Sequence, residues 1–147
     1  MITLTDQAFD PGAALTAFSA GRTESGAVAS FVGLARGEAG QATALELEAW
    51  PEFTAPEIEK IAETARHRFS LHDVGVIHRL GEIAPGEAIV MVMTAAAHRR
   101  EAFEGCDFLM DYLKSRAPLW KKEHGPEGAR WVEPSARDLA DVNRWDA

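Results

Sequence analysis

Two apolar runs, residues 26–35 (GAVASFVGLA) and 88–93 (AIVMVM), constrain most strongly what this chain can fold into. Each run is typical of a β-strand that carries apolar side chains on both faces. Strands of this kind are usually covered on both sides and lie in the interior of a sheet. We therefore expect both runs to form central strands.

Strand and helix patterns alternate along the rest of the chain. We expect further strands at residues 2–4, 42–50 and 74–80, and Gly81 with Pro85–Gly86 supplies turn signals after the last of these. Asp10 and Pro11 are typical of a helix start. Thr54 and Glu57 match a capping box at the start of a second helix. The resulting order β-α-β-β-α-β-β-α predicts one α+β domain over residues 1–147, with helices packed on a largely antiparallel sheet.

Pro118 separates a third helix from a final hairpin. This helix begins near residues 94–98 and ends at Lys114 or Ser115, because proline inside a helix clashes with the carbonyl group four residues earlier. Residues 119–123 and 130–132 are expected to form a C-terminal β-hairpin. Residues 134–147 are expected to form a short helix or a tail that docks on a partner subunit.

The composition excludes several classes of function. A net charge of −8 argues against general nucleic-acid binding, which needs an excess of Lys and Arg. The N-terminus lacks the basic and apolar regions of a secretory signal, and no apolar run reaches the ~20 residues that span a bilayer. One cysteine permits no intrachain disulfide and fits a cytoplasmic protein. The five histidines lack metal-ligand spacing, so we expect no metal.

Residues 110–123 (MDYLKSRAPLWKKE) hold three of the four lysines in this acidic chain. Lys114 lies at the expected helix end and Lys121 on the strand after the proline corner, so both ammonium groups can face one pocket. Lysine there would suit phosphate binding, imine formation or activation of a nucleophile. Alternatively, Lys114 only complements the helix dipole, and one of Lys121 and Lys122 points into solvent.

Two further groups of cations are candidates for binding. His98, Arg99 and Arg100 stand at a helix start, where positive charge opposes the helix dipole. A bound anion would explain them. Equally, they point into water or pair with Glu101 and Glu104. Arg36 begins a loop at the end of a strand, which is a frequent place for binding residues.

With these features in place, the chain resembles the large, catalytic subunit of molybdopterin synthase. The resemblance rests on FVGLAR (31–36), VIHRLGEIAPGE (76–87), AAHRREAFEGCDFLMDYLKSRAPLWKKE (96–123) and PEGARWVE (126–133). It implies an α/β-hammerhead fold and a homodimer. It also implies that each copy binds a small ubiquitin-like sulfur-carrier subunit, which gives a heterotetramer without a cofactor.

The resemblance further implies a reaction and its residues. The carrier's C-terminal Gly-Gly thiocarboxylate would donate sulfur twice to cyclic pyranopterin monophosphate, building the dithiolene of molybdopterin. Lys114 and Lys121 match the family's pocket lysines, and Arg36, His98 and Arg99 match its substrate-binding positions. Two departures are a short GEAG loop after Arg36 and the lack of an arginine directly after RWVE, where Arg137 is the nearest substitute. The alternative function is a non-catalytic dimeric scaffold that binds anions.

Overall fold

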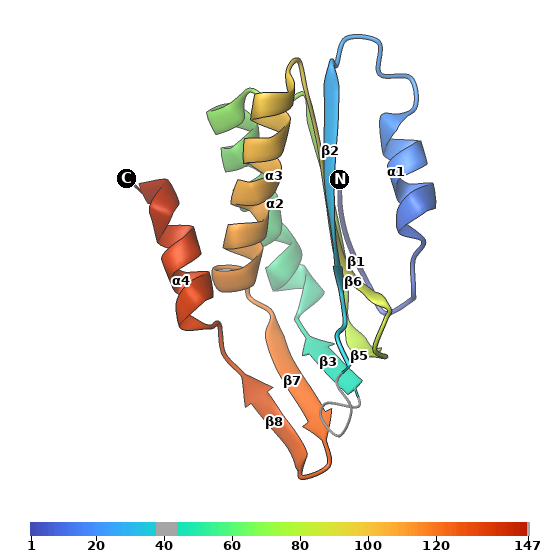
Figure 1. Cartoon of the computed structure of the whole chain (residues 1–147), viewed down its shortest axis with the longest axis vertical. Helices are drawn as coiled ribbons and strands as arrows, with labels where there is room; N and C mark the ends of the chain where they lie inside the picture. Colours follow the sequence, from blue (N-terminus) through green and yellow to red (C-terminus); the bar gives the residue numbers. More distant parts are fainter. Residues whose placement is uncertain (38–43, 147) are drawn as a thin grey trace.

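The computed structural model describes residues 1–37 and 44–146, and it contains two four-stranded sheets with helices packed against them (Figure 1). Residues 38–43 lie outside the described residues. They include most of the loop expected after Arg36 and the first two residues of the expected strand 42–50. In chain order the elements are β1 (Ile2–Thr5), α1 (Pro11–Ser19), β2 (Ala27–Leu34), β3 (Ala44–Glu48), α2 (Pro51–Phe69), β4 (Asp73–Arg79), β5 (Gly81–Ile83), β6 (Ala88–Ala96), α3 (Arg99–Ser115), β7 (Trp120–Gly125), β8 (Gly128–Val132), α4 (Ala136–Asn143) and the 3₁₀ helix η1 (Arg144–Asp146).

The strands divide into a large sheet and a small one. The large sheet has the order β1-β4-β6-β2 and the small sheet the order β5-β3-β7-β8. Among the described strands, β1 and β4 pair in parallel and the other pairs are antiparallel. The predicted α+β fold and the C-terminal hairpin, β7–β8, are therefore confirmed. The hairpin projects from the lower end of the molecule (Figure 1).

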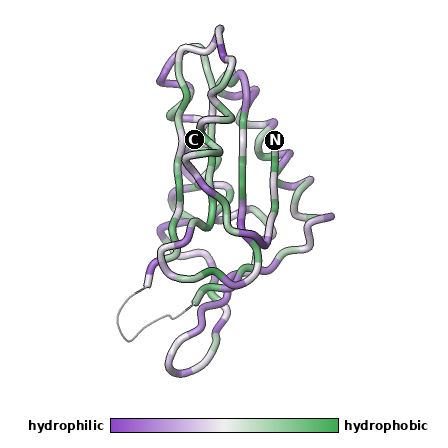
Figure 2. The backbone as a smooth tube through the Cα atoms, turned by 90° about the vertical axis from the view of Figure 1, so that its right-hand side faces the viewer, coloured by the Kyte–Doolittle hydropathy of each residue, from purple (hydrophilic) through white to green (hydrophobic). Residues whose placement is uncertain are grey.

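The main core lies between the large sheet and the pair α2 and α3. Val74, Val76 and Val92 on the strands meet Ile58 on α2 and Leu109 on α3, and all five are buried. Helix α1 covers the opposite face of the sheet (Figure 1), where its Phe18 packs near Met91 and Met93. Hydrophobic stretches run along the strands of this main body when the chain is viewed from the side (Figure 2). Since β6 carries buried side chains on both faces, it is the central strand that its sequence predicts.

The same prediction is wrong for β2, which is an edge strand. It pairs with β6 on one side, and no strand among the described residues pairs with its other side. Val28, Phe31 and Leu34 are exposed. A strand has two apolar faces when helices pack on both sides of its sheet. A strand at the edge of the sheet can meet this condition, because coverage of its faces does not depend on a hydrogen-bonded neighbour at each edge. The register shift at Gly33 confirms an irregularity there.

Helix α2 begins earlier than predicted. Trp50 is its N-cap residue and Pro51 its first residue, so Thr54 lies inside the helix and the predicted capping box is not formed. The reason is that Pro51 itself suits a first helical position. The Thr54 hydroxyl instead donates to the carbonyl oxygen of Pro118, at 2.9 Å. Strand β5 was also not predicted, because its three residues resemble a turn. Of the described helices, none is long and apolar enough to cross a membrane.

The C-terminal segment packs on α3 of its own chain. Helix α4 begins with a capping box between Ser135 and Asp138, and it ends beside the carboxylate of Asp111. That carboxylate accepts hydrogen bonds from Arg144, at 2.8 Å, and from the indole nitrogen of Trp145, at 2.6 Å. The predicted short helix is confirmed, whereas docking of this tail on a partner subunit stays a prediction.

We predict that Asp111→Ala lowers the free energy of unfolding by about 1–3 kcal/mol, because the indole N–H of Trp145 loses its acceptor. Asp107→Ala is the matched control. Asp107 also pairs with Arg144, but its side chain is 54% exposed against 13% for Asp111, so its loss should cost less than about 1 kcal/mol. Urea unfolding of both variants measures the difference, and equal losses would contradict the prediction.

Candidate active site

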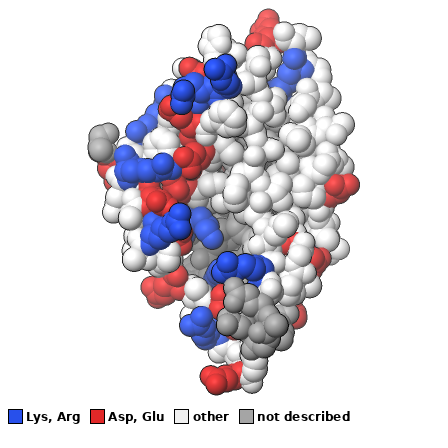
Figure 3. Space-filling model, viewed as in Figure 1, with Lys and Arg blue, Asp and Glu red and all other residues white. Residues whose placement is uncertain are grey.

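A small pocket of about 220 Å³ lies where the end of α3 and the start of β7 meet β3 and the end of β2. Figure 3 shows Lys and Arg side chains gathered around a hollow at this level of the molecule. The charged side chains of the pocket are those of Arg36, Lys114, Lys121 and Glu123. Its apolar walls are formed by Leu34, Ala35, Ala44, Leu45, Ile83, Pro85 and Ile89. The structure therefore brings together three of the six predicted site residues.

A tight corner places the two lysines on either side of the pocket. The amide groups of Arg116 and Ala117 both donate to the carbonyl of Tyr112, which ends α3. The amide of Leu119 then donates to the carbonyl of Ala117 at 2.8 Å, closing a three-residue turn around Pro118. Such a turn suits proline, whose φ angle is restricted by its ring. The chain passes from α3 into β7 within four residues, and Lys114 and Lys121 line the same cavity.

Strand alternation decides which of the neighbouring lysines enters the pocket. Lys121 pairs with Leu47, which is buried in the small core of the second sheet. Successive residues of a strand point to opposite faces. Lys122 therefore lies on the other face of the sheet, where its ammonium group is 4.9 Å from the centre of the Trp131 ring. The prediction that only one of these two lysines faces the pocket is confirmed, and Lys121 is that residue.

The charges of the pocket are not balanced. Among the residues that the structure describes, three cations line it together with one carboxylate, that of Glu123. Burial lowers the pKa of Lys121 most strongly, and the positive charges of Lys114 and Arg36 lower it further. Glu123 and Asp138 act in the opposite direction without cancelling the effect. A group carrying negative charge would restore the balance, so the pocket is suited to anions.

Glu123 and Asp138 are parts of the site that the sequence did not reveal. Strand alternation from Lys121 could have identified Glu123, which shares its face. No sequence signal indicates Asp138, because it reaches the site through the docking of α4, where its carbonyl accepts a hydrogen bond from Ser115. His78 is a buried core histidine, as predicted: Nδ1 lies 2.9 Å from the Arg79 carbonyl oxygen. Burial lowers the pKa of His78, and the charge of Lys114 also lowers it.

His98 and Arg99 lie far from the pocket within one chain. They stand at the start of α3 and Lys114 near its end, which separates them by about 24 Å at ~1.5 Å per residue. His98 is the N-cap residue, yet its side chain makes no capping hydrogen bond, and both residues are exposed. Across the described ranges 1–37 and 44–146, no ion pair joins Arg99 or Arg100 to Glu101 or Glu104.

Arg137 is also outside the pocket lining. It lies in the first turn of α4 and is exposed, whereas its neighbour Asp138 acts electrostatically on Lys121. Within the described part of the chain, no group of three or more His, Cys, Asp or Glu side chains is arranged to hold a metal ion. The buried thiol of Cys106 has its pKa raised to about 12, mainly by burial, and is therefore unsuited to act as a nucleophile.

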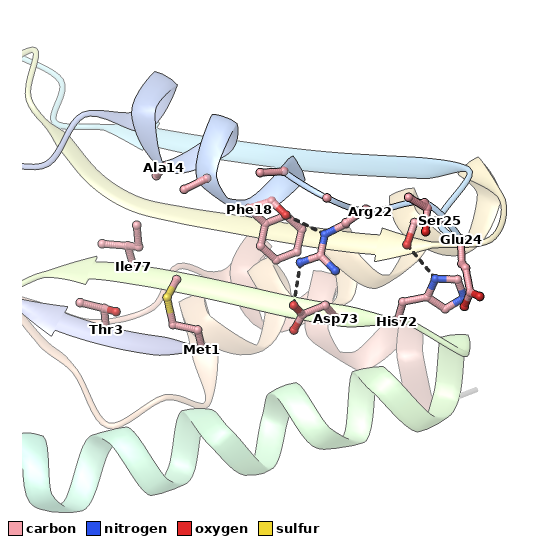
Figure 4. A pocket seen from close by; sticks show the side chains of 14 residues that line it. Met1, Thr3, Ala14, Phe18, Arg22, Glu24, Ser25, His72, Asp73 and Ile77 are labelled. Atoms are coloured by element: carbon pink, nitrogen blue, oxygen red, sulfur yellow. Dashed lines mark hydrogen bonds and ion pairs between the residues drawn. The ribbon is translucent and has the colours of Figure 1, made fainter.

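A larger groove of about 780 Å³ lies on the opposite face of the large sheet, beneath α1 (Figure 4). Several of its polar and charged groups already bind one another. Arg22 donates to Asp73 at 2.7 Å and to the Phe18 carbonyl at 2.6 Å, and Ser25 lies 2.7 Å from Nδ1 of His72. Because these groups bind one another, the groove has less capacity to select a charged ligand than the lysine pocket.

The fold and the pocket together define a class: an α+β domain with a small cationic cavity that suits an anionic group. Comparisons with known proteins give the family. Residues 4–116 match the family model described as MoaE protein. The molybdopterin synthase catalytic subunit of Caulobacter vibrioides is 68% identical over 146 residues, which cover 99% of this chain and 97% of that protein. The chain therefore belongs to the MoaE family of molybdopterin synthase catalytic subunits.

Solved structures agree with this assignment. The molybdopterin biosynthesis MoaE protein of Burkholderia ambifaria is 43% identical and superimposes with a TM-score of 0.85, covering 100% of this chain and 98% of that one. A protein–protein complex of subunits 1 and 2 of molybdopterin-converting factor from Helicobacter pylori contains a chain that is 21% identical. Its TM-score is 0.75, with 92% of this chain and 91% of that chain covered, and it shows the shared fold alone.

We predict that Lys114→Ala raises the pKa of Lys121, because a neighbouring positive charge no longer disfavours its protonated form. Lys121 would then lose its proton at higher pH than in the unmodified protein. The chain has only four lysines, so ¹³C NMR of labelled lysine side chains can follow each titration separately. Lys60→Ala, on the exposed surface of α2, is the control that should leave Lys121 unchanged. An unmoved Lys121 titration in Lys114→Ala would refute the electrostatic coupling.

Proposed function

We propose that this chain transfers sulfur from the thiocarboxylated C-terminus of a small ubiquitin-like carrier subunit to cyclic pyranopterin monophosphate, forming the dithiolene of molybdopterin. The observation that carries the proposal is the convergence of Lys114, Lys121 and Arg36 on one small pocket. Membership of the MoaE family supports the reaction. We further propose that the enzyme acts in the cytoplasm, with which its single cysteine is compatible.

The dimensions of the pocket suit the carrier's tail. At about 220 Å³ the cavity is smaller than the roughly 300–1,000 Å³ of typical small-molecule sites. An extended Gly-Gly end has no side chains and can enter such a space. Leu34, Leu45 and Ile89 provide apolar walls for its backbone, and the thiocarboxylate at its end carries the negative charge that the pocket lacks.

The lysines can stabilise the charge that develops during transfer. Sulfur attack on the pterin side chain displaces an oxygen substituent, which leaves as water or as the opened end of the cyclic phosphate, and the carrier stays bound through a thioester. Addition of water to the thioester carbonyl then breaks the bond between the acyl carbon and sulfur, which releases the carrier as a carboxylate and leaves the sulfur on the pterin. Negative charge accumulates on the carbonyl oxygen as water adds. Lys121, with Lys114 beside it, would stabilise that charge in a partly buried site where electrostatic effects are strong. Each of the two sulfur atoms requires one such cycle with a fresh carrier.

Substrate binding by His98 and Arg99 requires a second copy of the chain. The two residues are about 24 Å along α3 from Lys114, which is too far for all of them to contact one substrate within a single chain. In a homodimer, the start of α3 of one copy can approach the pocket of the other. Exposed apolar side chains on β2 and α3, Phe31, Leu34 and Phe103, support such an interface.

Arg36 would hold the pterin phosphate from within the pocket, while His98 and Arg99 of the second copy would bind it from outside. His98 can also act in proton transfer, a common role of histidine side chains in active sites. Arg137 is proposed as the substitute for the family's late arginine, because it begins the helix whose Asp138 already acts on Lys121. Two large and two small subunits would form a heterotetramer.

We predict that Lys121→Ala abolishes molybdopterin formation, with a loss of at least about 100-fold in rate. The assay combines the purified chain, thiocarboxylated carrier and cyclic pyranopterin monophosphate. Lys122→Ala is the matched control, because the neighbouring lysine lies on the other face of the strand and should keep its activity within about twofold. Circular dichroism must show that both variants are folded. Normal turnover by Lys121→Ala would end the proposed role and favour the non-catalytic scaffold.

We also predict that two inactive variants restore each other. In a mixed dimer of Lys121→Ala and Arg99→Ala, one pocket carries both substitutions and the other carries neither. Random reassociation should therefore recover about one quarter of the unmodified rate, if each pocket combines residues of two copies. If all residues of a pocket came from one chain, every pocket in the mixture would carry one substitution and no activity would return.

A further inference from the structure

The corner between the two lysines is held to the rest of the protein by a side chain from α2. The turn around Pro118 is closed internally by the amide of Leu119. Its outward carbonyl, that of Pro118, accepts the hydroxyl hydrogen bond of Thr54 at 2.9 Å. These two bonds act on different parts of the corner: the first sets its curvature, and the second sets where it lies relative to α2.

Thr54 is an unusual residue for its surroundings. It is 0% exposed and lies on the buried stripe of α2 with Ile58 and Ala62. A buried hydroxyl is costly unless it forms a hydrogen bond. Threonine in a helix commonly satisfies its hydroxyl by bonding to the carbonyl four residues earlier, as Thr64 does to Lys60 on this same helix. Thr54 instead bonds across 64 residues of chain to Pro118.

We propose that Thr54 is a positioning residue for the lysine pocket, which fixes the corner so that Lys114 and Lys121 approach the same point. Pro118 lies four residues after Lys114 and three before Lys121, so a shift of its carbonyl moves both flanks. The flanks belong to different units, since α3 packs on the large sheet and β7 belongs to the small one. Thr54 therefore controls a relative position that neither sheet fixes alone.

This inference rests on the proposed function where it concerns catalysis, but its geometric part does not. Loss of the hydrogen bond between Thr54 and the Pro118 carbonyl should let Lys121 move away from Lys114 and toward solvent. Burial and the charge of Lys114 are the two largest causes that lower the pKa of Lys121, so both would weaken. The pKa of Lys121 should then rise toward the ordinary lysine value, and this can be measured without carrier or pterin.

Thr54→Val and Thr54→Ser test the proposal. Valine keeps the shape of threonine and removes the hydroxyl, whereas serine keeps the hydroxyl and removes the methyl group. We expect Thr54→Val to raise the pKa of Lys121 in the lysine NMR titration and to lower kcat about tenfold, with KM for the carrier nearly unchanged. Thr54→Ser should restore both the titration and kcat. If Thr54→Val does not fold, Thr54→Cys, with a weak donor of similar size, should show the same changes more mildly.

Two other threonines are matched controls. Thr94 is equally buried and donates to the Ala102 carbonyl at 2.7 Å, so Thr94→Val should destabilise the fold without moving the Lys121 titration. Thr64→Val removes a hydroxyl from the same helix at an exposed position and should leave kcat unchanged. An unaltered Lys121 titration in Thr54→Val, or a Thr54→Ser variant that behaves like the valine variant, overturns the proposal. If Thr54→Val shifts the Lys121 titration while the unmodified protein transfers no sulfur, the positioning role is retained and the proposed function is rejected.

Discussion

The proline corner at residues 116–119 is the constraint on which the arrangement of the site depends. Pro118 cannot continue α3, and the turn around it redirects the chain into β7 within four residues. Helix α3 is anchored to the large sheet by Leu109 and Leu113, and β7 is the strand that joins the C-terminal hairpin to the small sheet. The corner therefore joins two separate cores. A pocket at this junction can take one lysine from each.

The distribution of charged pairs lets an acidic chain contain a local cationic site. The net charge is −8, yet three of the four charged groups that line the pocket are positive. Carboxylates elsewhere are engaged in structural pairs, such as Asp111 with Arg144 and Asp73 with Arg22. Hydrogen bonds from Arg22 and from the Val74 amide hold the pKa of Asp73 below its usual range, although burial acts to raise it. These pairs maintain the fold and leave the cations of the pocket unaffected.

Local chemistry predicted most elements, and long-range contacts account for the errors. Pro118 and Asp10 act within one turn of helix, so the sequence alone was sufficient to predict what they do. The edge position of β2 depends on which strands pair, which apolar patterning does not encode. Thr54 matched a capping pattern, but its partner lies 64 residues away. At the site, the sequence grouped Lys114 and Lys121 correctly because they flank one corner. The predicted helix already placed His98 and Lys114 at opposite ends, so only the resemblance to a family grouped them in one site.

The excess positive charge of the pocket lowers the stability of the fold, and a bound anion would raise it again. Because the pKa of Lys121 is lower in the folded protein than in the unfolded chain, the unfolded chain binds that proton more tightly. Stability therefore rises as the pH increases through the folded pKa toward the unfolded one, and below the folded pKa the protonated lysine opposes folding. A protein that used this corner only for structure would gain nothing from placing Lys114 beside Lys121. An anionic group bound between them would stabilise both ammonium groups at once, so the charge arrangement that weakens the empty fold would, in the proposed reaction, contribute to affinity and to stabilisation of developing negative charge.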